Sequence, residues 1–168
     1  MIRKSLLALA ALTLAGAAHA SLYTFTGSID TDPTATTVVT GSFSFDDADV
    51  AAGGSDGSFA LTSLDFSFHG ETFMLADALN STDLNYTYVL FEGGSLTGPN
   101  ASFTTSEGTF SFQGFFGISS FTFAPTRGDE QLGTLALTQS TVPEPASLAL
   151  VMGSLAAVGV ASRRRKAA

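Results

Sequence analysis

Apolar and polar residues alternate at every second position through most of the segment between residues 21 and 141. Phe43 and Phe45, for example, are each preceded by a serine. The pattern recurs at Tyr23 and Phe25, Leu64, Phe66 and Phe68, Tyr86, Tyr88 and Leu90, Phe110 and Phe112, Phe121 and Phe123, and Leu135 and Leu137. Successive side chains of a β-strand point to opposite faces of a sheet, so this alternation predicts strands with one buried face.

Clusters of glycine, aspartate, asparagine and proline separate these alternating runs. They lie at 46–49, 53–54, 93–94, 98–100 and 127–129, and such residues favour turns and loops. The helical candidate in this segment is residues 75–79, which is long enough for a single turn. Seven or more short strands joined by such loops predict an all-β domain, with an antiparallel β-sandwich or jelly-roll-like fold.

Phenylalanine supplies the material for the core of this domain. All 15 phenylalanines lie between Phe25 and Phe123, and the chain contains no cysteine. Each buried aromatic side chain removes roughly 150–250 Å² from water. We therefore expect aromatic packing to hold the domain together without a disulfide, a metal or a cofactor.

Charge is distributed unevenly along the chain. Six of the seven basic residues lie at the two ends, whereas residues 21–141 contain fourteen acidic residues and one arginine. The formal charge of that segment is therefore −13. Nucleic-acid binding depends on lysine and arginine neutralising phosphates, so the acidic balance argues against nucleic acid as a partner.

Residues 1–20 have the features of a secretory signal peptide in the expected order. A basic start and an apolar run precede a cleavage motif with small residues at Ala18 and Ala20. We expect signal peptidase to cut after Ala20, so that the exported domain, residues 21–141, begins at Ser21.

Residues 146–162 contain no charged residue and are followed directly by a basic cluster. Seventeen residues at a helical rise of 1.5 Å extend roughly 25 Å, which is at the short end for crossing a bilayer core. The cluster, typical of the cytoplasmic side of a membrane span, consists of Arg163, Arg164, Arg165 and Lys166. We expect a transmembrane helix at 146–162 and a basic cytoplasmic end at 163–168.

Val142, Pro143, Glu144 and Pro145 join the domain to this apolar segment. Two prolines so close together do not fit a helix interior or a central strand, and each favours an extended conformation in the residue before it. We expect a stiff, exposed element at the membrane surface, which a processing enzyme could grip.

The tail at 142–168 resembles the PEP-CTERM sorting domain, because the VPEP motif, the apolar span and the basic cluster follow one another in that order. The resemblance implies recognition by an exosortase, a membrane-embedded cysteine transpeptidase or protease, with cleavage close to Pro143-Glu144-Pro145. It also implies delivery to the surface of a Gram-negative bacterium, in association with exopolysaccharide and biofilm matrix. That family defines the tail only, so it implies no activity for residues 21–141.

Asp46, Asp47, Asp49 and Asp56, with the glycines at 53–54, form the strongest metal candidate in the sequence. Carboxylate oxygens on a glycine-rich loop suit Ca²⁺. The spacing does not match an EF-hand loop, however. A solvated acidic loop that keeps the domain soluble is the alternative, and the sequence assigns no metal ligand.

Catalytic chemistry has few residues available in the exported domain. His69 is its single histidine, lies where a hairpin is expected to turn, and is not accompanied by a G-x-S-x-G elbow. Glycoside hydrolysis needs two carboxylates across a cleft. Glu71, Glu92 and Glu107 are available for it, but the sequence singles out no pair. The sequence therefore assigns no catalytic residue.

The leading hypothesis is a non-enzymatic, exported protein of the cell surface or extracellular matrix. Its partners are expected to be signal peptidase, an exosortase-like membrane enzyme and exopolysaccharide, with the membrane itself contacted through residues 146–162 before processing. A carbohydrate-binding, lectin-like surface module is the alternative, and an envelope hydrolase is a third. A defined glycan affinity would favour the second hypothesis, and a cleft with two carboxylates the third.

Overall fold

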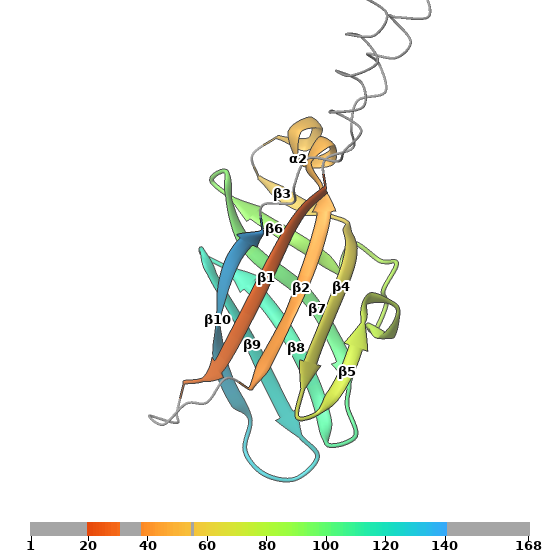
Figure 1. Ribbon diagram of the computed structural model, residues 1–168, viewed down its shortest axis with the longest axis vertical. Coiled ribbons are helices and arrows are strands. Elements are labelled where there is room, and N and C mark those ends of the chain that lie inside the picture. Colours follow the sequence, from red (N-terminus) through yellow and green to blue (C-terminus); the bar gives the residue numbers. More distant parts are fainter. Residues whose placement is uncertain (1–19, 31–37, 55, 141–168) are drawn as a thin grey trace, which may run out of the picture.

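A computed structural model of the chain describes residues 20–30, 38–54 and 56–140 (Figure 1). Ten strands make up most of this part. They are β1 (Ala20–Ile29), β2 (Val39–Asp46), β3 (Gly57–Phe59), β4 (Leu61–Phe68), β5 (Glu71–Met74), β6 (Tyr88–Glu92), β7 (Ser95–Thr104), β8 (Gly108–Phe115), β9 (Ile118–Pro125) and β10 (Gln131–Ser140). The helical elements are α2 (Asp47–Gly53) and the 3₁₀ turn η1 (Leu75–Asp77).

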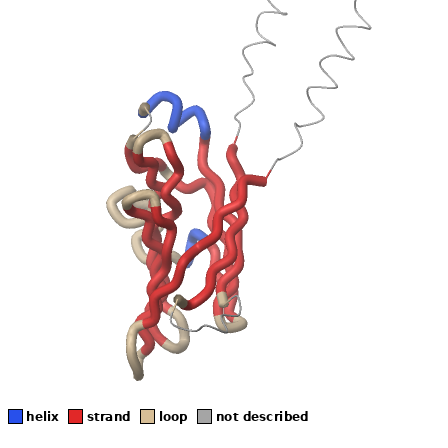
Figure 2. Tube along the Cα trace, turned by 90° about the vertical axis from the view of Figure 1, so that its left-hand side faces the viewer, coloured by secondary structure: helices blue, strands red, loops and turns tan. Residues whose placement is uncertain are grey.

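The ten strands form one sheet in the order β3-β6-β7-β8-β9-β10-β1-β2-β4-β5, and all neighbouring strands are antiparallel. The sheet curls, so that the half containing β1, β2 and β4 faces the half containing β7, β8 and β9 (Figures 1 and 2). Beyond η1 the chain crosses towards β7, where Ala78 lies opposite Phe103 and the Leu79 N–H donates to the Ser102 carbonyl at 2.8 Å. This crossing brings the β5 side of the sheet close to β7.

The structure confirms the prediction of an all-β antiparallel domain, but it does not confirm a jelly roll. The two facing layers belong to a single continuous sheet, whose strand order follows the chain from β6 to β10 and again from β1 to β2. Alternation along each strand reports which face is buried, and it carries no information on which strands pair.

Two of the expected loops are regular structure instead. Residues 98–100 lie inside β7, where Gly98 and Pro99 pair with β6 next to a register shift that leaves Thr97 as the extra residue. Residues 47–49 begin α2, because the Asp46 carboxylate accepts a hydrogen bond from the Ala48 N–H at 2.8 Å and caps the helix. The expected helical turn at 75–79 is confirmed by η1.

The core is an assembly of phenylalanine rings between the two halves of the sheet. Twelve phenylalanines are buried: Phe25, Phe43, Phe45, Phe59, Phe66, Phe68, Phe73, Phe103, Phe110, Phe112, Phe121 and Phe123. Phe66 of β4 occupies the centre, with ring centroids 4.8–5.2 Å from those of Phe73, Phe103, Phe110 and Phe112. Edge-on and tilted ring pairs of this kind add stabilisation beyond the buried area alone.

Glycines within the strands make room for these rings. Gly41 of β2 pairs with Phe25 on one side and with Phe66 on the other. A Cβ atom at Gly41 would lie only 2.6 Å from Phe25 Cζ and from Phe66 Cβ. Gly133 of β10 has the same relationship to its partner Phe121. The absence of a side chain at these positions therefore lets the rings lie flat against the neighbouring strand.

We predict that Phe66→Ala lowers the free energy of unfolding by about 3–5 kcal/mol, because it leaves a cavity that four rings cannot fill by small movements. Urea unfolding followed by circular dichroism measures the change. The matched control is Phe116→Ala, at a side chain that is 86% exposed, which should change the free energy by no more than about 0.5 kcal/mol. Equal effects of the two substitutions would contradict the central position of Phe66.

Candidate functional site

The first and last strands of the domain are neighbours in the middle of the sheet. β1 and β10 pair over eight residues, from Leu22 opposite Ser140 to Ile29 opposite Gly133. The first residue of β1 and the last residue of β10 therefore lie at the same end of the domain (Figure 1). We call this the tail end, because the sequence-predicted sorting tail begins two residues beyond Ser140.

Most of the sequence-predicted processing residues lie outside the described residues. This holds for Ala18 in the signal region, and for Val142, Pro143, Glu144 and Pro145 with Arg163, Arg164, Arg165 and Lys166 in the tail. Within the described ranges, no helix has the length and apolar character needed to span a membrane. Ala20 and Ser21, which flank the expected signal cleavage, are the first two residues of β1.

Two of the four aspartates of the calcium candidate accept backbone hydrogen bonds near the tail end. Asp46 caps α2, and Asp56 Oδ1 accepts a hydrogen bond from the Gly93 N–H. Asp47 and Asp49 lie in the first turn of α2, where negative charge is favourable. No group of three acidic or histidine side chains in the described part of the chain is placed to hold a metal ion. Asp46 and Asp56 therefore have structural roles in this segment, one as a helix cap and one as a contact to the β6–β7 turn.

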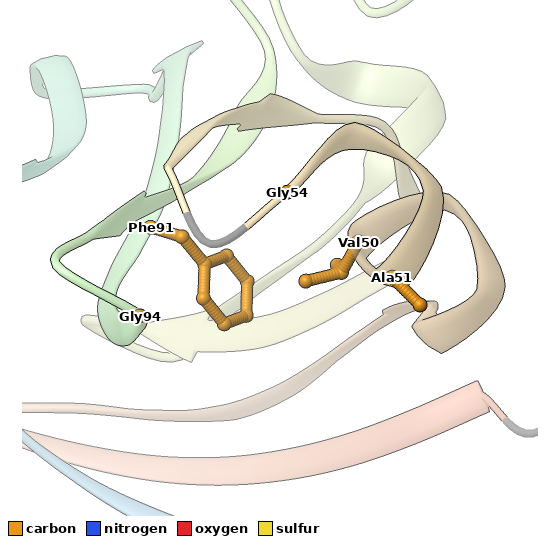
Figure 3. A pocket seen from close by; sticks show the side chains of 5 residues that line it. All are labelled: Val50, Ala51, Gly54, Phe91 and Gly94. Carbon is orange, nitrogen blue, oxygen red and sulfur yellow. The ribbon is translucent and has the colours of Figure 1, made fainter.

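An open hollow of about 360 Å³ lies beside α2 (Figure 3). Its lining residues are Val50, Ala51, Gly54, Phe91 and Gly94. The Phe91 ring is anchored edge-on against Phe45 at 5.4 Å and Phe59 at 5.8 Å between ring centroids. The described residues that line this hollow carry apolar side chains or none.

The opposite end of the domain holds the single histidine. His69 lies in the β4–β5 turn with φ of 49°, and its Nδ1 is 3.0 Å from Glu107 Oε2 in the β7–β8 turn. The imidazole stacks on the Phe68 ring, with centroids 4.1 Å apart. These contacts fix the ring against the edge of the core and join two turns that are distant in sequence.

Ser106 is held by Glu71 instead of by His69. The Glu71 carboxylate accepts hydrogen bonds from the Ser106 hydroxyl and from the Ser106 N–H, the latter at 3.3 Å. A nucleophilic serine needs its hydroxyl hydrogen-bonded to a general base such as histidine. The structure therefore brings a serine, a histidine and two carboxylates to one end without connecting them as a catalytic triad.

A second open hollow, of about 450 Å³, lies next to these turns. It is lined by Ser106, Glu107, Pro125, Thr126 and Arg127. Thr126 donates from its N–H at 2.7 Å and from its hydroxyl at 2.9 Å to the Glu107 carbonyl, which fixes the β9–β10 loop against the β7–β8 turn. Among the described residues, the Arg127 guanidinium forms no salt bridge. The sequence did not indicate this hollow, because two connections that are distant in sequence, the β7–β8 turn and the β9–β10 loop, build it.

Exposed apolar side chains occur in two further places. Phe115, Phe116 and Ile118 form the tip of the β8–β9 hairpin, and Tyr86 lies in the loop before β6. The Gly117 N–H at the hairpin tip donates to Glu92 Oε2 at 3.1 Å. Glu92 therefore has a structural hydrogen bond, and it is not paired with Glu71 or Glu107 across a cleft.

Residues 141–166 match the family model of the PEP-CTERM protein-sorting motif. The match confirms the sequence-based identification of the tail and covers 26 of the chain's 168 residues. No curated protein and no solved structure gave a match to the chain.

We predict a pH-dependent contribution to stability from Tyr23, which lies on β1 opposite Gln139 near the tail end. Burial raises the pKa of the Tyr23 phenol above its ordinary value of 10.0, and the negative charge of Asp47 raises this pKa further. The folded state thus favours the neutral phenol. The contribution of Tyr23 to the stability of the fold is fully present below about pH 10. It is lost as the pH rises through the higher pKa that Tyr23 has in the folded state.

Urea unfolding at a series of alkaline pH values measures how the free energy of unfolding falls as the pH rises. Tyr23→Phe should reduce this pH dependence. Asp47→Asn should lower the Tyr23 pKa, as followed by phenolate absorbance. An unchanged pH dependence of the free energy of unfolding in Tyr23→Phe would show that other groups cause the alkaline loss of stability.

Proposed function

We propose that this chain is an exported protein of the bacterial surface or extracellular matrix, which an exosortase-like membrane enzyme processes at its C-terminal tail. The observation that carries the proposal is the PEP-CTERM sorting motif at residues 141–166, which implies an exported protein targeted to an exosortase. The folded domain would be the delivered cargo, and the tail its temporary membrane attachment.

The proposed roles divide among three groups of tail residues. Val142, Pro143, Glu144 and Pro145 form the element that the enzyme recognises and cuts. Residues 146–162 form the span that holds the chain in the inner membrane. The basic cluster at 163–166 stays on the cytoplasmic side, because positive charge is retained there.

The geometry of the domain supports a non-enzymatic role for the delivered part. The Ser106 hydroxyl is hydrogen-bonded to a carboxylate, and a carboxylate pair across a cleft is not present in either described hollow. The domain carries a large negative charge and a core of stacked rings that needs no cofactor. These properties suit a stable, soluble component of an exopolysaccharide or biofilm matrix in a Gram-negative bacterium.

We predict that a chain lacking Pro143, Glu144 and Pro145 accumulates with its full tail in the native host. The enzyme would lose the extended element that it grips, whereas export through the signal peptide would continue. Intact mass spectrometry of the membrane fraction and the medium distinguishes the cut from the uncut chain. A chain lacking only Ala167 and Ala168, which lie beyond the basic cluster, is the control. Normal cutting of the chain without Pro143, Glu144 and Pro145 would refute the sorting role.

A second candidate function is glycan binding by the hollow opposite the tail end. The supporting observation is its composition: Arg127, Glu107, Ser106 and Thr126 offer charged and hydroxyl groups around the apolar ring of Pro125. Its position at the far end from the membrane attachment would leave it free to meet polysaccharide.

For this candidate we predict that Arg127→Ala weakens binding to exopolysaccharide purified from the native host by about tenfold, a loss expected for a central interface arginine. Isothermal titration calorimetry measures the affinity. Gln139→Ala, on the strand end next to the tail, serves as the control and should leave the affinity unchanged. Equal affinity of the wild-type and Arg127→Ala proteins would exclude this hollow as the binding site.

A further inference from the structure

The β8–β9 hairpin ends in a group of exposed apolar side chains. Phe116 is the most exposed large apolar side chain that the structure describes, at 86%, and Phe115 and Ile118 beside it are 47% and 52% exposed. The Phe115 and Phe116 rings meet edge-on with centroids 5.7 Å apart, and Phe115 pairs with Ile118 across the hairpin. We call these three side chains the hairpin tip. Contiguous exposed apolar groups mark contacts with other proteins or with membranes.

The backbone at Phe116 shows that the fold itself does not favour an aromatic residue there. Phe116 and Gly117 form the two-residue turn of the hairpin, with φ of 50° and 73°. A two-residue hairpin turn with both φ values positive is of type I′, which favours Asn-Gly. A bulky side chain at positive φ is strained. The Phe116 ring is thus both exposed to water and held on a strained backbone, which points to a contact outside the domain.

The hairpin tip lies on the tail-end side of the domain. β9 runs antiparallel to β10, with Ser120 opposite Thr134, so β9 begins at the end where β10 finishes (Figure 1). Ser140 is six residues beyond Thr134, and Gly117 is three residues beyond Ser120 in the same direction. At about 3.4 Å per residue, the turn is therefore set back from Ser140 by only about 10 Å along the strands.

The length of chain after Ser140 limits how far this end of the domain can be from a membrane that holds the tail. The expected span begins at Ala146, six residues after Ser140. Six residues reach no more than about 21 Å when fully extended. This reach is greater than the set-back of about 10 Å estimated for the hairpin turn. A domain leaning on its tail can therefore bring the hairpin tip to the bilayer surface.

The chemistry of the hairpin tip suits the boundary between lipid headgroups and acyl chains. Residues 113–120 carry no charged side chain. Glu92 lies beside the turn, and its Oε2 already accepts hydrogen bonds from the Gly117 N–H at 3.1 Å and from the Thr97 hydroxyl at 3.2 Å. Large apolar side chains bury themselves at this boundary when a polar element presents them. Residues 21–141 have a formal charge of −13, so the matching bilayer surface is zwitterionic and not anionic.

We infer that Phe115, Phe116 and Ile118 insert into the membrane surface as a second, weaker contact beside the tail. This inference rests on the proposed function, because the tail is what brings the hairpin tip to the membrane. Stable attachment to a bilayer takes two signals, and a single small apolar group binds only marginally. The hairpin tip would therefore hold the domain against the bilayer while the tail is present, and would let the domain leave once the tail is cut.

Phe116→Trp reports on this contact, because the chain contains no tryptophan of its own. The full chain with this substitution is produced in an export-competent bacterial host without an exosortase, so that the tail stays attached, and is reconstituted into phosphatidylcholine vesicles. We expect its fluorescence emission to shift to shorter wavelength and to be quenched by brominated phosphatidylcholine. Leu132→Trp is the matched control, since Leu132 is 54% exposed near the opposite end of β10. Its emission should not change with lipid.

A second variant tests whether the phenylalanine serves the fold instead. Phe116→Asn introduces the residue type that a type I′ turn favours at this position. The midpoint of urea unfolding should therefore stay the same or rise. A lower midpoint would show that the Phe116 ring stabilises the hairpin itself, and it would overturn the inference.

The vesicle experiment separates the inference from the proposed function. A chain that does not float with the vesicles would refute the membrane role of the tail, and with it the proposed function. A chain that floats, but whose Phe116→Trp emission responds to lipid no more than that of Leu132→Trp, would overturn the inference alone. A shift to shorter wavelength that appears without lipid and grows with protein concentration would identify a second copy of the chain as the partner, and would also overturn the inference.

Discussion

Aromatic packing across a curled sheet is the constraint on which the rest of this domain depends. Phe66 meets rings from β5, β7 and β8, so it contacts strands from both halves of the sheet. The phenylalanine rings can lie flat against the adjoining strands because Gly41 and Gly133 have no side chain there. A glycine in a strand normally weakens it, but here the covering ring compensates for the missing side chain. Contacts between phenylalanine rings therefore close the core.

The same curl gives the domain two different ends. At the tail end, β1 and β10 lie side by side, with α2 and its apolar hollow nearby. At the other end, three turns combine the single histidine, Ser106 and the single arginine of the exported domain. Processing chemistry belongs to the first end under the proposed function. The second end has the polar groups through which a ligand in the matrix could be bound.

The sequence predicted local features well and long-range ones poorly. Alternation identified nine of the twelve buried phenylalanines, since burial along a strand is a local property of period two. It wrongly extended the strand at Tyr88 back to Tyr86, which lies exposed in the loop before β6. The sequence placed Gly98 and Pro99 in a loop because glycine and proline favour turns. In the structure both residues stay within β7, next to a register shift against β6. The sequence-based prediction also missed the cap on α2, although Asp46 followed by acidic residues is a helix-start signal. The pairing of His69 with Glu107 depends on two turns 38 residues apart, which no spacing in the chain reveals.

The position of β10 also determines how the domain would carry mechanical load. β10 lies between β1 and β9 and continues directly into the tail. A protein held at the C-terminal end of β10, and gripped at the end that carries Arg127, would be pulled along the axis of β10. Antiparallel hydrogen bonds run across this axis, so those joining β10 to β1 would be sheared together instead of opening one after another. A matrix component attached in this way would resist tension in the direction in which flowing water pulls on a cell-bound layer.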